Sequence, residues 1–301
     1  MDTHKKSNFK ERFEQNIIPY LFVLPGMTLF FLIAVIPVAQ TIILSFTDWN
    51  GVTQLNQMKF IGFNNFINVF SSEQFKIALF NNLQWAVVGT TIPIVIGLVQ
   101  AAIIVNSKIK FKNAFILVLF LPQILSSMIM SIMWLAIYDP ASGALNAFLE
   151  LIGLRQFTGP WLGSKETAFK SLLLMSIWAG YGFNTVIYSS AIRAVDQTMY
   201  EAAEIDGANT LQQFFKITIP SINKTTTTLL LLSLIGSFKV YDSVAQMTRG
   251  GPGYHTYTLS YYLYNTAFTM NKASLGCAIA VILTIIVFTV SQVFQKVRGT
   301  D

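Results

Sequence analysis

Long runs of apolar residues without charge constrain this chain more than any other feature of its sequence. Of its 301 residues, 53% are hydrophobic and only 11% are charged, whereas a soluble domain carries about 25% charged residues. A lipid core takes about 20 helical residues. Six stretches are long enough and are predicted as spans: residues 17–46, 83–105, 113–138, 171–192, 225–247 and 274–294. The sequence therefore predicts an all-α integral membrane protein with six transmembrane helices in a single domain, residues 1–301.

Two of these stretches contain residues that are unusual within a span. The first contains Pro25 and Pro37, which predict a kink, and the fifth contains Lys239 and Asp242. A basic N-terminus before an apolar run resembles a signal peptide. However, the uncharged run over residues 15–47 is far longer than the apolar part of such a peptide, so we expect a retained first span.

Lysine and arginine residues gather on one side of the predicted membrane. The segments on that side hold twelve of them: four before residue 13, three over residues 107–112, three over residues 193–224 and two after residue 295. The opposite segments hold seven over longer stretches. Because basic residues stay in the cytoplasm, both termini are predicted to be cytoplasmic. The same loops explain the net charge of +6 without a nucleic-acid partner.

The sequence offers no pattern for a metal site, a disulfide or a nucleotide-binding loop. Cys277 is the one cysteine, and His4 and His255 are far apart in the sequence without ligand-type neighbours. No Gly-Lys dipeptide occurs, which excludes a P-loop. We therefore expect that this chain binds no cofactor.

The predicted cytoplasmic loop over residues 196–222 is long enough to need structure of its own. Thr198 and Glu201 have the spacing of a capping box, which predicts a short helix starting there. Gly207 can adopt a positive φ and end that helix. Small residues and acids follow one another on it: Glu201, Ala202, Ala203, Glu204 and Asp206. A partner protein's surface could therefore approach it closely.

A second helix is predicted after Gly207. Thr210 and Gln213 repeat the capping spacing, and Pro220 marks the predicted end. The residues expected on one face of this helix are Leu211, Phe214, Phe215 and Thr218. The two predicted helices of this loop form an elbow, which is typical of a docking surface. An amphipathic helix resting on lipid is the alternative, which the acids oppose because the cytoplasmic leaflet is negative.

This loop resembles the EAA loop of ABC-importer permeases. It reads Glu201-Ala202-Ala203, three residues, Gly207, nine residues, then Ile217-x-Ile219-Pro220, and the family pattern is E-A-A-x3-G-x9-I-x-L-P. Ile219 replaces leucine. Further stretches resemble the carbohydrate-uptake branch of the MalF/UgpA type: Asp48-Trp49-Asn50, residues 62–66, Trp161-Leu162-Gly163, Asp206-Gly207-Ala208, Phe214–Pro220 and Gly250-Gly251-Pro252. The large insertion and two extra spans of the maltose-type subunit are missing, so the chain resembles the compact six-span form.

The resemblance implies a type I importer in a bacterial cell membrane. Its partners would be a second permease subunit in a heterodimer, two ATPase subunits that carry ATP and Mg, and an extracellular solute-binding protein that delivers a carbohydrate. The residues implied in coupling to the ATPase are Glu201, Ala202, Ala203, Glu204, Gly207, Ile217 and Pro220. This chain would be a transport subunit and not an enzyme.

The same resemblance places candidate cargo contacts in two spans. They are Ala179, Gly180, Phe183, Ser233, Gly236, Ser237 and Val240. Ser237 and Val240 differ from the maltose-type residues, which argues against maltose as the cargo. Gly, Ser and Ala are equally typical of close helix packing. Lys239 and Asp242 are spaced for a mutual ion pair, which could be structural or could line the path. Five tyrosines are expected to form an interfacial belt and cap rather than a sugar site: Tyr254, Tyr257, Tyr261, Tyr262 and Tyr264.

Three alternatives remain open at this stage. An ABC permease could carry a solute other than sugar, such as a glycerol phosphate or an amino-acid conjugate. A secondary transporter would need intramembrane acids for ion coupling, and only Asp242 qualifies. A structural or signalling membrane protein would make the EAA spacing a coincidence.

Overall fold

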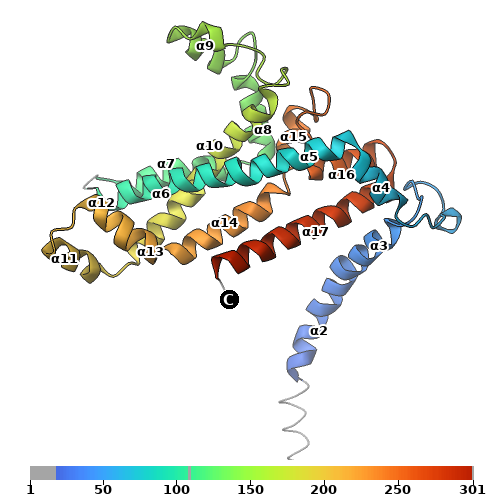
Figure 1. The fold of residues 1–301 in the computed structure, drawn as a ribbon, viewed down its shortest axis with the longest axis horizontal. Coiled ribbons are helices and arrows are strands. Elements are labelled where there is room, and N and C mark those ends of the chain that lie inside the picture. The colour runs from blue at the N-terminus through green and yellow to red at the C-terminus, as the bar shows by residue number, and fades with distance from the viewer. Residues whose placement is uncertain (1–17, 108–109, 300–301) are drawn as a thin grey trace, which may run out of the picture.

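The computed structural model describes residues 18–107 and 110–299, and it is built of helices (Figure 1). Within these residues there is no strand, although an isolated bridge joins Thr47 and Phe60. α6 (Thr90–Asn106), α14 (Asn223–Ser237) and α17 (Ala273–Arg298) run beside one another, whereas α2 (Ile18–Phe30) points away from them (Figure 1). α11 (Gln197–Ile205) lies beyond one end of this bundle, and α9 (Ala144–Leu151) projects from it (Figure 1). The all-α prediction is therefore confirmed for this part of the chain.

The first predicted span is helical from Ile18 to Leu44 and ends in a turn at residues 45–46. Its elements are α2 (Ile18–Phe30), the π-helical turn η1 (Phe31–Val35) and α3 (Ile36–Leu44). Pro37 stands in the first turn of α3, where its missing N–H is tolerated, and η1 precedes it. Residues Tyr20–Leu44 are apolar, and none of their most apolar stretch is buried within the chain. The predicted start at residue 17 lies outside the described residues.

The second predicted span belongs to a longer helical run of 34 residues. The run consists of α5 (Glu73–Gln84), the π-helical turn η3 (Trp85–Gly89) and α6 (Thr90–Asn106). The Ser72 hydroxyl begins it by accepting a hydrogen bond from the backbone N–H of Phe75 at 3.2 Å. The helix thus starts at Glu73 rather than at residue 83, because hydropathy marks the lipid-covered part and not the first helical turn.

Two predicted spans are broken helices. The third divides into α7 (Lys112–Ile124) and α8 (Ser127–Ile137), which meet at 94°. The fifth divides into α14 (Asn223–Ser237) and α15 (Asp242–Met247). Continuous helices were predicted here, and the structure differs because apolar composition reports the surrounding solvent and not the continuity of the backbone.

The fourth and sixth predicted spans are unbroken helices, α10 (Ala168–Arg193) and α17 (Ala273–Arg298). Shorter elements connect the long ones: η2 (Leu55–Gln57), α4 (Asn64–Ser71), α9 (Ala144–Leu151), η4 (Arg155–Phe157), α16 (Leu259–Tyr264) and η6 (Asn265–Thr269). In the described chain, three helices are long and apolar enough to cross a membrane, or up to four if α7 and α8 form one span.

Glycines let α10 approach its neighbours. A Cβ at Gly97 of α6 would lie 2.5 Å from the Cβ of Asn184, and a Cβ at Gly182 would overlap the carbonyl oxygen of Leu119 in α7. Small residues allow such contacts between membrane helices. Gly97 and Gly182 therefore hold α6, α7 and α10 together as one packed group.

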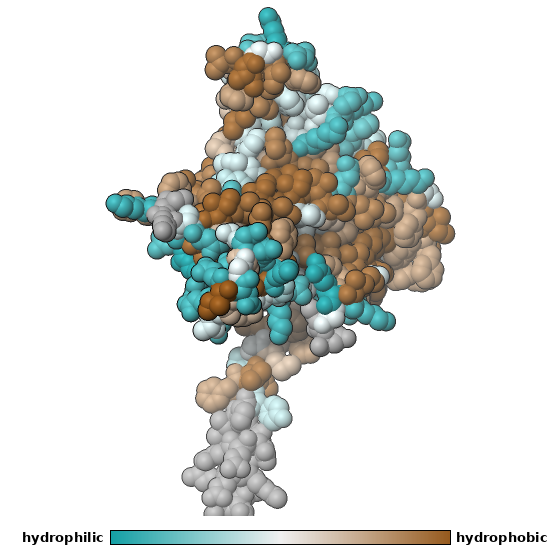
Figure 2. Space-filling view, turned by 60° about the vertical axis from the view of Figure 1, so that its left-hand side comes forward, coloured by the Kyte–Doolittle hydropathy of each residue, from teal (hydrophilic) through white to brown (hydrophobic). Residues whose placement is uncertain are grey.

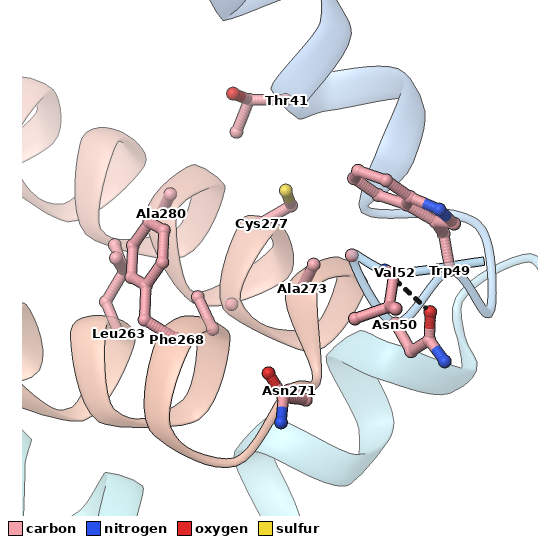
Figure 3. A pocket seen from close by; sticks show the side chains of 13 residues that line it. Thr41, Trp49, Asn50, Val52, Leu263, Phe268, Asn271, Ala273, Cys277 and Ala280 are labelled. Carbon is pink, nitrogen blue, oxygen red and sulfur yellow. Dashed lines mark hydrogen bonds between the residues drawn. The ribbon is translucent and has the colours of Figure 1, made fainter. Parts of the chain in front are cut away.

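The first span meets α17. The hydroxyls of Thr47 and Ser274 lie 2.8 Å apart, and the backbone N–H of Ser274 donates to the carbonyl of Trp49 at 2.9 Å. A cavity of about 420 Å³ lies at this junction, with Thr41 on one side and Cys277 on the other (Figure 3). No charged side chain lines it, so we interpret it as a packing gap.

Candidate functional site

The predicted coupling loop begins with α11 (Gln197–Ile205). The Asp196 carboxylate caps it by accepting a hydrogen bond from the backbone N–H of Thr198 at 3.0 Å. This hydrogen bond lowers the pKa of Asp196 below its ordinary value, because it stabilises the charged carboxylate. The predicted cap at Thr198 is therefore wrong by two residues: an aspartate just upstream occupies the capping position.

Gly207 ends α11 in the left-handed conformation, with φ of +79°. The backbone N–H of Ala208 donates to the carbonyl of Ala203 at 2.8 Å, and that of Gly207 donates to the carbonyl of Glu204 at 3.0 Å. These two bonds form a Schellman motif, which requires a residue that tolerates positive φ. The predicted helix end at Gly207 is confirmed.

The second helix of the loop starts one residue before its prediction. It comprises α12 (Thr210–Gln213), the π-helical turn η5 (Phe214–Thr218) and α13 (Ile219–Ser221). Asn209 and Gln212 form the capping box, with hydrogen bonds of 2.9 and 2.8 Å. Pro220 lies one residue before the observed helix end at Ser221, close to its prediction. It stands in the first turn of α13, where no N–H is needed.

α11 is held away from the rest of the chain. None of its residues is buried, and Glu201, Ala202, Glu204 and Gly207 are exposed. Sequence reasoning missed the exposed Ile205, whose exposed fraction is 88%; an apolar residue near the end of a short acidic helix was the available signal. With the α11 end of the molecule turned forward, Figure 2 shows hydrophilic side chains gathered over this end.

The second helix contacts the membrane helices on one side and α11 on the other. Leu211 and Phe215 line an apolar groove of about 450 Å³ together with Ile103 at the end of α6. Thr218 does not share that face as predicted. It is buried, and its hydroxyl lies 2.9 Å from the hydroxyl of Tyr200 in α11. Ile217 is half-buried in the same turn.

The broken helices meet around a cavity of about 470 Å³. Its walls come from the π-helical turn η3, the α7–α8 break, the middle of α10 and the α14–α15 break. The lining residues are Trp85, Gln123, Leu125, Ser126, Ser127, Met130, Met175, Ser176, Ala179, Gly180, Lys239, Val240, Tyr241, Asp242 and Ser243. Irregular backbone at membrane depth is tolerated where it is buried in protein or lines a cavity.

Polar side chains satisfy the carbonyls at the α14–α15 break. Asn82 donates to the carbonyl of Ser237 at 2.7 Å, Ser260 to that of Phe238 at 2.9 Å, and Thr258 to that of Val240 at 2.6 Å. The Asn82 side chain also accepts from the backbone N–H of Leu259 at 2.7 Å and is fully buried. Sequence reasoning missed Asn82, which lies at an ordinary position of an amphipathic helix.

The predicted cargo contacts divide into two groups. Ala179, Gly180 and Val240 line the cavity. Four others do not line it: Phe183, Ser233, Gly236 and Ser237. The Ser237 hydroxyl donates to the carbonyl of Leu234 at 2.6 Å, and this side chain is buried.

Lys239 and Asp242 both line the cavity. They form no ion pair with each other; in the described chain the ion pair within 4 Å joins Arg155 and Glu150 at 3.6 Å. The five tyrosines of the predicted belt and cap do not share one environment. Tyr257, Tyr261 and Tyr262 are buried, and the rings of Tyr257 and Tyr261 pack at 5.1 Å around the turn at residue 250, whereas Tyr254 and Tyr264 are exposed.

Residues 93–297 match the family model described as binding-protein-dependent transport system inner membrane component. The chain belongs to this family. Alignments with curated relatives extend over nearly the whole of this inner membrane component. The probable ABC transporter permease protein YurN of Bacillus subtilis is 34% identical over 94% of this chain and 96% of its own. The trehalose/maltose transport system permease protein MalF of Thermococcus litoralis is 27% identical over 99% and 98%.

Solved structures share the fold of this inner membrane component. A bacterial alginate ABC transporter, crystallised in complex with an alginate pentasaccharide-bound periplasmic protein, has a chain that superposes with a TM-score of 0.83 at 22% identity, covering 95% of each chain. The predicted resemblance to ABC-importer permeases is confirmed. The chain is a multi-pass membrane subunit for transport and not an enzyme, and ATP hydrolysis belongs to a separate subunit.

Proposed function

We propose that this chain is the permease subunit of an ATP-driven, binding-protein-dependent importer for a sugar or oligosaccharide. It would cross a bacterial cell membrane six times, the two broken helices counting as one span each, with both termini cytoplasmic. A second permease subunit would complete the path, and an extracellular solute-binding protein would deliver the cargo. Two ATPase subunits would bind ATP and Mg and drive transport through the EAA loop.

The observation that carries this proposal is the exposed, rigidly capped α11. α11 is capped and none of its residues is buried, so its whole surface is available to a partner protein that moves it. The exposed side chain of Ile205 is shielded from water when such a partner binds. Glu201 and Glu204 offer charge for complementary recognition. The link through Tyr200 and Thr218 passes movement of α11 to the helices that lead into α14.

Two features support a sugar as cargo. The names of three relatives refer to starch degradation products, trehalose/maltose and arabinooligosaccharides. The cavity at the helix breaks combines the rings of Trp85 and Tyr241 with hydroxyl and amide side chains. Aromatic rings stack on the C–H faces of a sugar, and its hydroxyls need hydrogen-bonding partners.

The coupling proposal is tested with Glu201→Lys combined with Gly207→Asp in the full chain, expressed with the other importer subunits. We expect the variant to insert at normal levels, to lose at least about tenfold of the copurifying ATPase, and to lose sugar uptake. Glu150→Lys on α9 is the matched control, because it reverses an equally exposed charge whose surface ion pair contributes little. Normal uptake and normal ATPase copurification in the double variant would refute the docking function of α11.

A further inference from the structure

A cation and an anion without partners face the same membrane cavity. Lys239 follows the C-terminal end of α14, and Asp242 is the first residue of α15. Both line the cavity of about 470 Å³. In the described chain neither side chain forms an ion pair or a side-chain hydrogen bond. Two charged groups are therefore free to bind something that enters.

The position of these charges needs a physical reason. α14 has 15 residues, so at 1.5 Å per residue it is about 22 Å long, which is less than the thickness of a lipid core of about 30 Å. If the proposed fifth span enters the membrane with α14, the residues that follow its end lie inside that core. Charged side chains at this depth are costly and mark functional sites. Lys239 is favoured locally because the carbonyl end of α14 carries partial negative charge, but that interaction does not use its three N–H donors.

The lining as a whole has no net charge. Among the residues around the cavity, Lys239 is the one cation and Asp242 the one anion. Lys239 can only donate hydrogen bonds, whereas an ionised Asp242 can only accept them. Neighbouring hydroxyls on a sugar ring both donate and accept, so a single diol matches a donor and an acceptor three residues apart. An acidic group would instead meet the carboxylate of Asp242.

We propose that Lys239 and Asp242 bind the cargo together and select an uncharged polyhydroxy compound against sugar acids and sugar phosphates. This inference rests on the proposed function and narrows its cargo class. Tyr241, whose ring packs 4.8 Å from that of Tyr264, lies between the two charges in the sequence and lines the same cavity. It offers an aromatic face to the ring whose hydroxyls the two charges hold.

The test measures uptake in cells that lack this chain and are complemented with full-length variants and the native partner subunits. One probe set contains labelled neutral trisaccharides of glucose, xylose and arabinose. The other set contains trigalacturonate and glucose 6-phosphate. Each variant is scored by the ratio of acidic to neutral uptake, because this ratio does not depend on the amount of protein in the membrane.

We expect chain-dependent uptake of a neutral trisaccharide and little of the acidic probes. Asp242→Asn should lower neutral uptake about tenfold, the value of one charge-assisted hydrogen bond, and should raise the acidic-to-neutral ratio, because an uncompensated cation remains. Lys239→Met should lower neutral uptake similarly without raising the ratio. Glu150→Gln and Lys165→Met, at exposed positions outside the cavity, are matched controls that should leave both quantities unchanged.

Two results would count against the proposals in different ways. If saccharides are taken up but the ratio does not change in Asp242→Asn, or if wild-type uptake favours the acidic probes, the selection by Lys239 and Asp242 is refuted while the sugar-permease function stands. If no probe of either set is taken up in a chain-dependent manner, the proposed function itself is refuted.

Discussion

The hydroxyl groups of Tyr200 and Thr218 lie 2.9 Å apart and join the two helices of the loop over residues 196–222. Tyr200 is half-buried in α11, and Thr218 is buried at the end of η5. Four residues after Thr218 comes Ile222, directly before α14. A hydrogen bond between side chains 18 residues apart thus connects the exposed α11 to the segment that leads into α14, and the break after α14 lines the cavity.

Replacing Tyr200 by phenylalanine should weaken coupling without removing the docking surface. A hydrogen bond of this kind contributes about 1 kcal/mol, so we expect transport per ATP hydrolysed to fall about two- to fivefold while ATPase copurification stays normal. Adding Thr218→Val should have little further effect, because both changes remove the same bond. Tyr254→Phe, at an exposed tyrosine outside the loop, is the control. Equal transport per ATP in Tyr200→Phe and wild type would contradict the prediction.

Substitutions at Gly207 should follow the cost of positive φ. A Cβ at this position meets nothing within 4 Å, so only the backbone conformation decides. The Gly207→Asn variant should bind the ATPase nearly normally. Gly207→Ala should lower the stability of the helix end by about 1 kcal/mol, and Gly207→Val should lower it further. ATPase copurification from the full importer measures the series. A ranking by side-chain volume, with asparagine among the worst, would mean that crowding and not φ governs the site.

Replacing Asn82 by alanine should destabilise the helix break more than any exposed asparagine does. The change leaves the carbonyl of Ser237 and the N–H of Leu259 without their partner in a fully buried site. We expect a loss of about 2–5 kcal/mol, since each buried unsatisfied group costs about 1–3 kcal/mol. Unfolding in detergent measures it. Asn68→Ala, at an exposed position of α4, should change stability by less than about 0.5 kcal/mol; similar values for both variants would contradict the role of Asn82.

Gly250 and Gly153 form a matched pair that separates steric overlap from backbone strain. Their φ angles are +82° and +78°, but a Cβ at Gly250 would overlap the ring of Tyr257, whereas a Cβ at Gly153 meets nothing within 4 Å. Gly153→Ala should therefore cost about 1 kcal/mol, and Gly250→Ala more than about 3 kcal/mol, because overpacking is added. Thermal unfolding of both variants checks this. Comparable shifts would show that the tyrosine rings move aside.

Local patterns predicted the elbow well. Capping residues and Gly207 act within one turn of chain, so the sequence locates both helices to within two residues, and the errors at Thr198 and Thr210 arise because Asp196 and Asn209 compete for the same role. The EAA spacing is equally local. The helices of the predicted spans without a break follow from their apolar composition.

The breaks around the cavity could not be predicted in this way. The α14–α15 break is held by hydrogen bonds from Asn82, Thr258 and Ser260, and Asn82 is 155 residues from its partner Ser237. No window of sequence contains both ends of such a contact. The cavity is therefore lined by Gln123 and Ser126, which lie at an unpredicted bend. Ser237, at the end of α14, does not line it.

A ribosome completes α3 more than two hundred residues before it begins α17, yet α17 is the helix against which α3 principally packs outside its own span. Until residue 274 has been synthesised, the hydroxyl of Thr47 lacks its partner Ser274. The first span then contacts lipid and few other residues of its own chain. Nascent chains that stop before residue 273 would retain α6, α7 and α10 as a packed group but leave this helix unattached. Synthesis of α17 therefore makes this contact possible, and the contact joins the first described span to the last described helix.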